Sequence, residues 1–122
     1  MLLENKTVLI MGIRNKWSIA WGAARSAADN GAKVLFTFMG EENRGKIEEL
    51  ISEIPNAKAY ECDASSDELI KKCFEKIKEE NGKLDGILHS IAHANTEDLR
   101  NDFITTSREG FSHANDVSAY SF

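Results

Sequence analysis

Residues 7–22 read TVLIMGIRNKWSIAWG, and this stretch sets the expectation for the rest of the chain. Its first five residues, Thr7–Met11, are apolar and partly β-branched, which predicts a short buried strand that ends at Gly12. Small and apolar residues then recur with helical spacing, and Gly31 stands where the end of a helix favours glycine. The predicted inner face of this helix is Ile19, Ala20, Ala23, Ala24, Ala27 and Ala28.

The alternation of strand and helix continues along the chain. Three further strands are predicted at Lys33–Phe38, Ala57–Cys62 and Gly86–Ile91. Between the first two of these lies an apolar helical stripe of Ile47, Leu50, Ile51 and Ile54, which ends at Pro55. Two capping boxes, each a hydroxyl residue followed three positions later by a glutamate, predict where the remaining helices begin. They are Ser65 with Glu68, ahead of Leu69, Ile70, Cys73, Phe74 and Ile77, and Thr106 with Glu109, ahead of Phe111, Ala114, Val117 and Tyr120.

This order of elements predicts an α/β fold. Near-continuous apolar strands joined by helices are typical of a parallel sheet that is covered on both faces. Because crossover connections are right-handed, the order favours a Rossmann-type, doubly wound sheet with the strand order 3-2-1-4. No repeat, linker or low-complexity segment interrupts residues 1–122, so we expect them to form one domain.

Composition excludes several classes of function. A net charge of −5 argues against a general nucleic-acid-binding protein, and no apolar run approaches the length of a membrane span. The N-terminus lacks the apolar stretch of a secretory signal, so we expect a cytoplasmic protein. Cys62 and Cys73 have no metal-binding spacing; they are expected to be reduced thiols, although a disulfide between them stays open. No metal site and no nucleophile with its base is predicted.

Three segments rich in small residues follow strands and should meet at one edge of the sheet, where such folds bind ligands. They are residues 12–22, 62–64 and 90–94. Gly12 would give the tight turn, Ser18 would cap the helix, and Gly22 would let helix and strand pack closely. The free amides at that helix N-terminus suit a pyrophosphate. An ordinary strand-to-helix loop with a capped helix fits the spacing equally well.

Longer motifs carry a resemblance to a known family. In order along the chain they are Gly12 with Ser18-Ile19-Ala20-x-Gly22, Leu35-Phe36-Thr37-Phe38, Cys62-Asp63, His89-Ser90-Ile91-Ala92, Ser107-Arg108-Glu109-Gly110-Phe111 and Ser118-Ala119-Tyr120-Ser121-Phe122. The chain resembles the N-terminal half of bacterial enoyl-[acyl-carrier-protein] reductase, a member of the short-chain dehydrogenase/reductase superfamily that completes each cycle of fatty-acid elongation. The resemblance implies a partial dinucleotide-binding domain over residues 1–122, an acyl-carrier-protein-linked enoyl substrate and a homo-oligomer.

The resemblance also implies a set of site residues. The expected cofactor-binding residues are Gly12, Ser18, Ile19, Met39, Asp63, Ala64, Ser90, Ile91 and Ala92, and Ala94 is expected to face the substrate. Asp63 would meet the adenine and Ile91 the nicotinamide ribose, although Asp63 also suits a turn and Ile91 a core. Met39 departs from the family, which often has a polar residue there. Of the histidines, His93 lies near the expected ligand and His113 has no obvious partner.

NADH is the expected cofactor, and NADPH is disfavoured. No basic residue directly follows the second strand, where Gly40, Glu41 and Glu42 come before Arg44. A 2′-phosphate is repelled by carboxylates and needs a basic neighbour.

The chemistry of the family needs a tyrosine followed several residues later by a lysine. Neither Tyr60 nor Tyr120 is followed by a lysine at that spacing, so no catalytic residue is assigned and the chain is expected to be inactive alone. A stand-alone, non-catalytic nucleotide-binding module is the alternative. A phosphoacceptor signalling domain is excluded, because Met11 and Gly12 provide no acidic cluster after the first strand.

Overall fold

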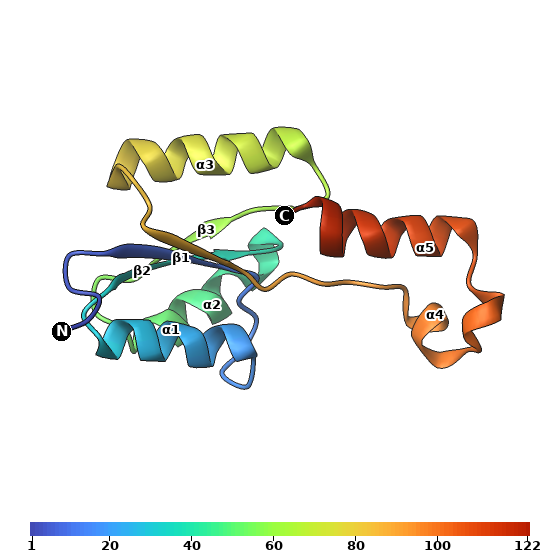
Figure 1. Ribbon diagram of the computed structural model, residues 1–122, viewed down its shortest axis with the longest axis horizontal. Coiled ribbons are helices and arrows are strands. Elements are labelled where there is room, and N and C mark those ends of the chain that lie inside the picture. The colour runs from blue at the N-terminus through green and yellow to red at the C-terminus, as the bar shows by residue number, and fades with distance from the viewer. The chain divides into compact units, whose positions relative to one another are not determined.

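A four-stranded parallel sheet organises the first part of the chain (Figure 1). The computed structural model describes all residues 1–122, which divide into two units, Met1–Ser90 and Ile91–Phe122. The strands are β1 (Thr7–Met11), β2 (Lys33–Phe38), β3 (Lys58–Glu61) and β4 (Gly86–His89), in the order β3-β2-β1-β4. The predicted fold class and the strand order 3-2-1-4 are thus confirmed.

The two later strands are shorter than predicted. β3 lacks Ala57 and Cys62, and β4 ends at His89 instead of Ile91. Hydrogen bonding nevertheless continues one residue further on each, because the amide of Cys62 donates to Phe38 O at 2.8 Å and that of Ser90 to Met11 O at 3.1 Å. Both segments are therefore fixed to the sheet where the predicted site begins.

Helices cover both faces of this sheet, with α1 and α2 on one face and α3 on the other (Figure 1). These helices are α1 (Ile19–Asp29), α2 (Arg44–Ile51) and α3 (Asp67–Asn81), and a short 3₁₀ turn, η1 (Glu41–Asn43), leads into α2. The main apolar core lies between the sheet and the α1–α2 layer. Its largest members include Trp21 and Phe36, whose rings stack with centroids 6.2 Å apart. Burial of such rings is a dominant source of stability.

The inner face of α1 differs from the prediction. Ile19 is 87% exposed, and a side chain at Gly22 would meet nothing within 4 Å, so Gly22 does not serve close packing of helix and strand. The buried positions are Ala20, Trp21 and Ala24. At 3.6 residues per turn these three share one side of the helix, and Ile19 and Gly22 fall roughly opposite. The tryptophan decides the orientation, because it buries far more area than isoleucine or alanine.

Both predicted capping boxes are wrong by one residue. α3 is capped by Ser66, whose Oγ accepts from the Leu69 amide at 3.2 Å, while the Ser65 hydroxyl donates to Asp63. The helix α5 (Arg108–Asn115) is capped by Ser107, while the amide of Thr106 closes the preceding turn by donating to Phe103 O. In each case the first of two adjacent hydroxyl residues forms a hydrogen bond within the turn before the helix. The second hydroxyl residue then caps the helix.

Two apolar stripes also need correction. Leu69, in the first turn of α3, is 41% exposed, whereas Cys73 and Ile77 are buried as predicted. α2 ends at Ile51, so Ile54 is not helical, yet it remains 4% exposed and belongs to the core.

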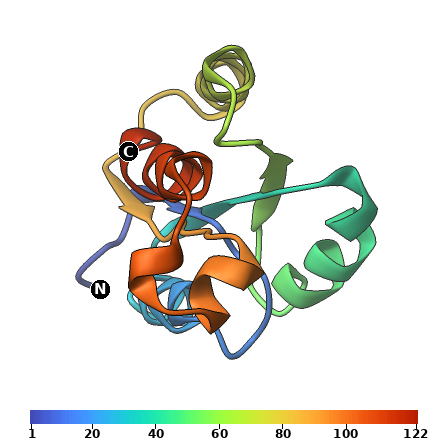
Figure 2. The ribbon, with the colours of Figure 1, turned by 90° about the vertical axis from the view of Figure 1, so that its right-hand side faces the viewer.

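The second unit is helical. It contains α4 (Thr96–Arg100), the 3₁₀ turn η2 (Phe103–Thr105), α5 (Arg108–Asn115) and a π-helical turn, η3 (Asp116–Tyr120), that continues α5 (Figure 2). Gly110 is its one buried residue. Across both units, no helix is long and apolar enough to pass through a bilayer.

Candidate nucleotide-binding site

The carboxyl ends of the strands bring residues of the predicted site to one edge of the sheet. Gly12 directly follows β1, Met39 directly follows β2, and Asp63 lies two residues beyond β3. In an open parallel sheet this edge is where ligands bind, beside the point where the strand order reverses. That point lies here between β1 and β4, and Ser90 follows β4 at the same edge.

The turn at Gly12 is fixed to the neighbouring strand. Gly12 has φ of 88°, a left-handed conformation in which a side chain is strained. Its amide donates to Thr37 O at 3.1 Å and to Thr37 Oγ1 at 3.3 Å, and the amide of Ile13 donates to the same carbonyl at 3.1 Å. Thr37 is the one buried polar residue of the core, and these bonds account for its burial. The chain therefore leaves β1 in a defined direction towards α1.

The N-terminus of α1 fits an anionic group. Ser18 is the N-cap, as predicted, with its Oγ accepting from the Trp21 amide at 3.3 Å and donating to Asn15 O at 2.7 Å. The first two helical amides, those of Ile19 and Ala20, have no acceptor within the helix. They stand at the positive end of the helix dipole, so the donors present suit a pyrophosphate.

Asp63 is an ionised acceptor at this edge. Its Oδ1 accepts from the amide of Ser65 at 2.9 Å and from its hydroxyl at 2.6 Å, and these bonds lower the pKa of the carboxyl. Because both bonds use Oδ1, Oδ2 keeps acceptor capacity for an exocyclic amine. Asp63 thus has the turn role that the sequence left open, and this role is compatible with a ligand contact. Ala64, beside it, is buried.

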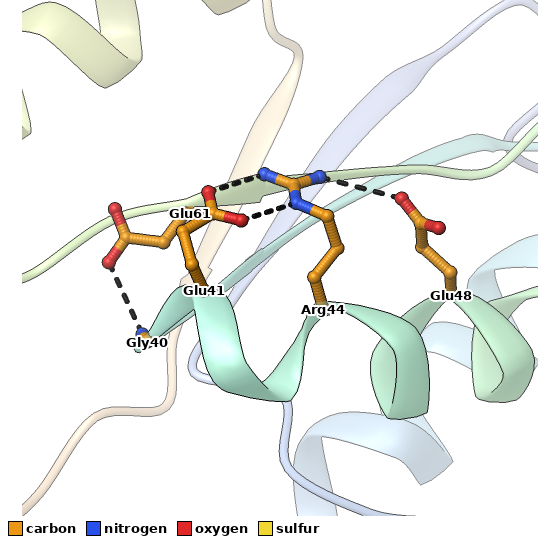
Figure 3. Close-up of polar contacts among 5 residues, drawn as sticks. All are labelled: Gly40, Glu41, Arg44, Glu48 and Glu61. Carbon is orange, nitrogen blue, oxygen red and sulfur yellow. Dashed lines mark hydrogen bonds and ion pairs between the residues drawn. The ribbon is translucent and has the colours of Figure 1, made fainter.

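The loop after β2 contains a group of charges that sequence reasoning did not assemble (Figure 3). Met39 is 63% exposed, and Gly40, with φ of 88°, donates its amide to Glu61 Oε1 at 3.2 Å. Arg44 donates to both carboxylate oxygens of Glu41, at 2.7 and 2.8 Å, and to Glu48 at 3.5 Å. The Glu41–Arg44 pair could have been found from its i, i+3 spacing. Glu61 could not, because its place depends on the pairing of β3 with β2.

Ile91, Ala92 and Ala94 belong to the second unit and precede α4. Ile91 and Ala94 are half-buried and Ala92 is exposed. Within this unit His93 Nδ1 lies 2.7 Å from His113 Nε2, so His113 does have a partner, contrary to the prediction. Ser118 Oγ accepts from the His93 amide at 3.0 Å. The loop around Ala92 and Ala94 is therefore attached to the end of α5.

A hollow in the surface lies apart from the predicted site residues. It has a volume of about 720 Å³ and lies between α2, β3 and α3, with Arg44, Tyr60 and Cys73 among its lining residues. Neither Gly12 nor Ser18 nor Asp63 lines it. Cys62 and Cys73 are free thiols, as expected; contact with Cys73, together with burial, raises the pKa of Cys62. No cluster that could hold a metal ion is present.

Comparison with known proteins gives consistent matches over nearly the whole chain. Residues 12–122 match the family model described as enoyl-(acyl carrier protein) reductase. The enoyl-[acyl-carrier-protein] reductase [NADPH] of Staphylococcus aureus is 50% identical over 121 residues, which cover 98% of this chain and 47% of that protein.

Solved structures of reductases from the same family also match the fold of this chain. The Bacillus cereus enoyl-acyl carrier protein reductase with NADP⁺ and an indole naphthyridinone has a TM-score of 0.94 at 43% identity, over 98% of this chain and 48% of that one. The Anaplasma phagocytophilum reductase in complex with NAD has a TM-score of 0.95 at 30% identity, over 99% and 46%. The chain spans about half the length of the relatives it matches.

Proposed function

Because the chain belongs to the enoyl-(acyl carrier protein) reductase family, we propose that residues 1–122 form the nucleotide-binding part of an NADH-dependent reductase of enoyl-[acyl-carrier-protein] in fatty-acid elongation. The observation that carries the proposal is the meeting of Gly12, the α1 N-terminus and Asp63 at the carboxyl edge of the sheet. Bound NADH would supply the hydride for the enoyl double bond.

Each side chain or amide at this edge has a distinct task in the proposal. Gly12 and Ser18 shape the turn and the helix start that bind the pyrophosphate, and Ile19 contributes a free amide and an exposed side chain. Asp63 and Ala64 bind the adenine, with the carboxylate accepting from its amine. Met39 lies beside the adenosine ribose as an apolar contact.

The segment after β4 serves the other end of the cofactor. We assign Ser90, Ile91 and Ala92 to the nicotinamide ribose and Ala94 to the substrate, following the family motif that these residues match. Small side chains at Ala92 and Ala94 suit this role, because a ligand can approach the backbone there. The acyl-carrier-protein-linked substrate and the homo-oligomer of the proposal rest on the family resemblance.

NADH is the proposed cofactor, although relatives named for NADH and for NADPH both match the chain. The reason is local charge. Glu41 and Glu42 follow β2, and the first basic residue after them in the sequence, Arg44, already pairs with carboxylates. A 2′-phosphate entering this loop would meet net negative charge.

The alternative is a non-catalytic nucleotide-binding module. It is supported by Tyr60, which is buried and hydrogen-bonded to Glu80 and Asn81. We propose that the 122-residue polypeptide does not itself reduce an enoyl thioester. Both proposals require nucleotide binding at the same edge, so binding is the property to test.

Calorimetric titration of the 122-residue chain tests this proposal. NADH is expected to bind with a dissociation constant on the order of 0.1–1 mM, or about 4–5.5 kcal/mol. The residues assigned to the nicotinamide lie mostly on the unit whose large apolar side chains are exposed, so the adenosine half should provide most of the affinity. Asp63→Ala should weaken binding severalfold, while Asp67→Ala, also acidic but in the first turn of α3, serves as a matched control. Equal binding by parent and Asp63→Ala, or no binding by the parent, contradicts the proposal.

A further inference from the structure

The two cysteines of the chain, Cys62 and Cys73, lie on the same side of the sheet. The side chain of Tyr60 points towards α3, because its hydroxyl donates to Glu80 at 3.2 Å and accepts from Asn81 at 2.9 Å. Side chains alternate between the two faces of a strand, and the backbone amide of Cys62 continues the pairing of β3. Cys62, two residues after Tyr60, therefore points towards α3 as well.

Cys73 meets it from the helix. Cys73 lies one turn before Ile77 on the buried side of α3; Cys73 is 6% exposed and Cys62 5%. The two thiols are in direct contact, and this contact is the main influence on both. The hydrogen bond from Cys62 lowers the pKa of Cys73, and the same bond raises the pKa of Cys62.

The contact lies beside the residues assigned to the adenine. Cys62 directly precedes Asp63, and α3, which contains Cys73, begins at Asp67. The carboxylate of Asp63 is oriented by two bonds from Ser65, at 2.9 and 2.6 Å. A covalent bond between the two sulfur atoms would close a ring that contains this whole turn. A movement of Cys62 towards α3 would then displace the neighbouring carboxylate.

One of the two thiols borders the surface. Cys73 is among the residues that line the hollow between α2, β3 and α3, and Cys62 is not. The hydrogen bond from Cys62 and, to a smaller extent, the charge of Lys76 lower the pKa of Cys73. The thiolate is the form that attacks a disulfide. Cys73 is therefore placed to attack first, and Cys62 is placed to resolve the product.

We propose that Cys62 and Cys73 form a reversible disulfide that makes nucleotide binding by this chain depend on the thiol–disulfide balance of its surroundings. The effect on nucleotide binding rests on the proposed function, whereas formation of the disulfide does not. Disulfides in reducing compartments are usually transient and redox-sensing, which fits two thiols that are free in the structure.

The oxidant is a small-molecule disulfide of the glutathione type. The thiolate of Cys73 attacks one of its sulfur atoms, the S–S bond breaks, and the first small thiolate leaves and takes up a proton. The thiol of Cys62 then loses its proton, and its sulfur attacks that of Cys73 and releases the second small thiol. The two cysteines together lose two electrons and two protons, and the small disulfide is reduced to two thiols.

The competing explanation is that both thiols are only core residues. A buried cysteine packs as a small apolar side chain, and buried structural cysteines are inert. In that case neither thiol reacts while the chain is folded, and exposure to a disulfide changes neither the mass nor the binding of the protein.

Intact-mass measurement tests the disulfide. The 122-residue chain is equilibrated without denaturant at increasing ratios of oxidised to reduced glutathione, and its remaining thiols are alkylated after unfolding. We expect the parent to lose two hydrogen atoms and both alkylation sites without gaining glutathione, and dithiothreitol should reverse this. Cys62→Ala, which keeps Cys73, should stop at a mixed disulfide with glutathione. Cys73→Ala, the matched control, should react about tenfold more slowly.

Calorimetric titration tests the effect on binding. We expect the oxidised parent to bind NADH about fivefold more weakly than the reduced parent, because a displaced carboxylate keeps only part of its contact. The double variant Cys62→Ala/Cys73→Ala, treated with the same buffers, should show no difference. The comparison of the two parent forms needs no substitution, so it is decisive even if an alanine variant does not fold.

Three results overturn the inference. They are a parent that stays reduced at every ratio, a parent that forms only mixed or intermolecular disulfides, and an internal disulfide that leaves the affinity for NADH unchanged. Equal reaction rates of Cys62→Ala and Cys73→Ala overturn the assignment of Cys73 as the attacking thiol. A reduced parent that binds no NADH overturns the proposed function instead, and the mass measurement still decides whether the disulfide forms.

Discussion

The two units of the chain differ in how they bury apolar side chains. In Met1–Ser90 the strands and helices enclose a continuous core, in which Leu9, Leu35 and Phe36 are fully buried. In Ile91–Phe122 the large apolar side chains are exposed, among them Leu99 at 73%, Phe103 at 79% and Ile104 at 90%. The first unit therefore has the means to stabilise itself, whereas the second has helices whose apolar side chains lack cover.

This difference matters for the proposed function. The residues assigned to the adenosine half of the cofactor lie on the unit that has a core, so their geometry is fixed by the sheet. The residues assigned to the nicotinamide and substrate lie mostly on the unit without one. A ligand site needs a rigid support to keep its geometry. Under the proposed function, we therefore expect the geometry for adenosine binding to be stable in this chain. The geometry for substrate binding should depend on how well the second unit is ordered.

Truncation of one phenylalanine in each unit should give the largest difference. Phe36→Ala removes a fully buried ring that stacks on Trp21, and it should cost about 3–5 kcal/mol of the free energy of unfolding. Phe111→Ala removes a ring that is 56% exposed and should cost no more than about 0.5 kcal/mol. Urea denaturation followed by circular dichroism measures both.

Phe36→Leu keeps the comparison measurable if the alanine variant does not fold, because it retains more of the buried volume. Its cost should lie between those of the two alanine variants. Similar losses for Phe36→Ala and Phe111→Ala would show that the second unit has a core of its own, and the contrast drawn between the units would be wrong.

The sequence predicted the fold well because β1 and most of β2 are apolar and several turns between elements contain glycine. The four strands and the N-cap role of Ser18 follow from local pattern, and the strand order follows from the right-handedness of crossover connections. The errors occurred where local signals compete. Ser65 and Ser66 are both good caps, and only the bond from Ser65 to Asp63 decides between them. On α1, the size of Trp21 overrides the alanine stripe that placed Ile19 inside.

The site was predicted less completely, for a physical reason. Residues that lie at strand ends, such as Gly12 and Asp63, can be located once the strands are known. Contacts between separate strands or loops cannot, because they depend on register and side-chain direction. The bond from Gly40 to Glu61 and the pairing of His93 with His113 are of this kind. The contact roles of the site residues remain predictions for the binding experiments.

The two edges of the sheet differ in a way that should affect self-association. β3 carries charged side chains, Lys58 and Glu61, whereas β4 carries Ile87 and Leu88, which are 55% and 36% exposed. An apolar edge strand is a template for pairing with another chain, and charges on an edge oppose this. We therefore expect association through β4, visible by sedimentation at protein concentrations of about 10–100 μM, where a moderate dimer affinity would be resolved. Ile87→Lys should weaken it by about tenfold, or about 1.4 kcal/mol.

Lys58→Gln on the opposite edge is the control for this experiment and should leave the association constant unchanged. A single monomeric species of the parent across the whole concentration range would mean that the β4 edge is protected. Equal weakening by both substitutions would show that association does not depend on the edge strand.

The smallest effect is expected from Asp85, which connects the starts of β1 and β4. Its Oδ2 accepts from the Thr7 amide at 2.9 Å, and its Oδ1 lies 3.3 Å from Lys83 Nζ. The backbone bond from Thr7, followed by the contacts with Lys83, lowers the pKa of Asp85. A carboxyl whose pKa is lower in the folded state stabilises the fold above its unfolded pKa of about 4, and this contribution is lost as the pH falls through the folded value.

Asp85→Asn should therefore be less stable than the parent at pH 7, and this difference should shrink towards zero as acid protonates the parent carboxyl as well. Urea denaturation at several pH values measures this difference, and Lys83→Met separates the two partners. Because the Thr7 amide is the larger cause, Lys83→Met should keep most of the pH dependence that Asp85 contributes. The opposite outcome is a stability difference between parent and Asp85→Asn that stays constant on acidification. That result would mean that the carboxylate charge does not help to join β1 and β4, and that side-chain shape and neutral hydrogen bonds suffice there.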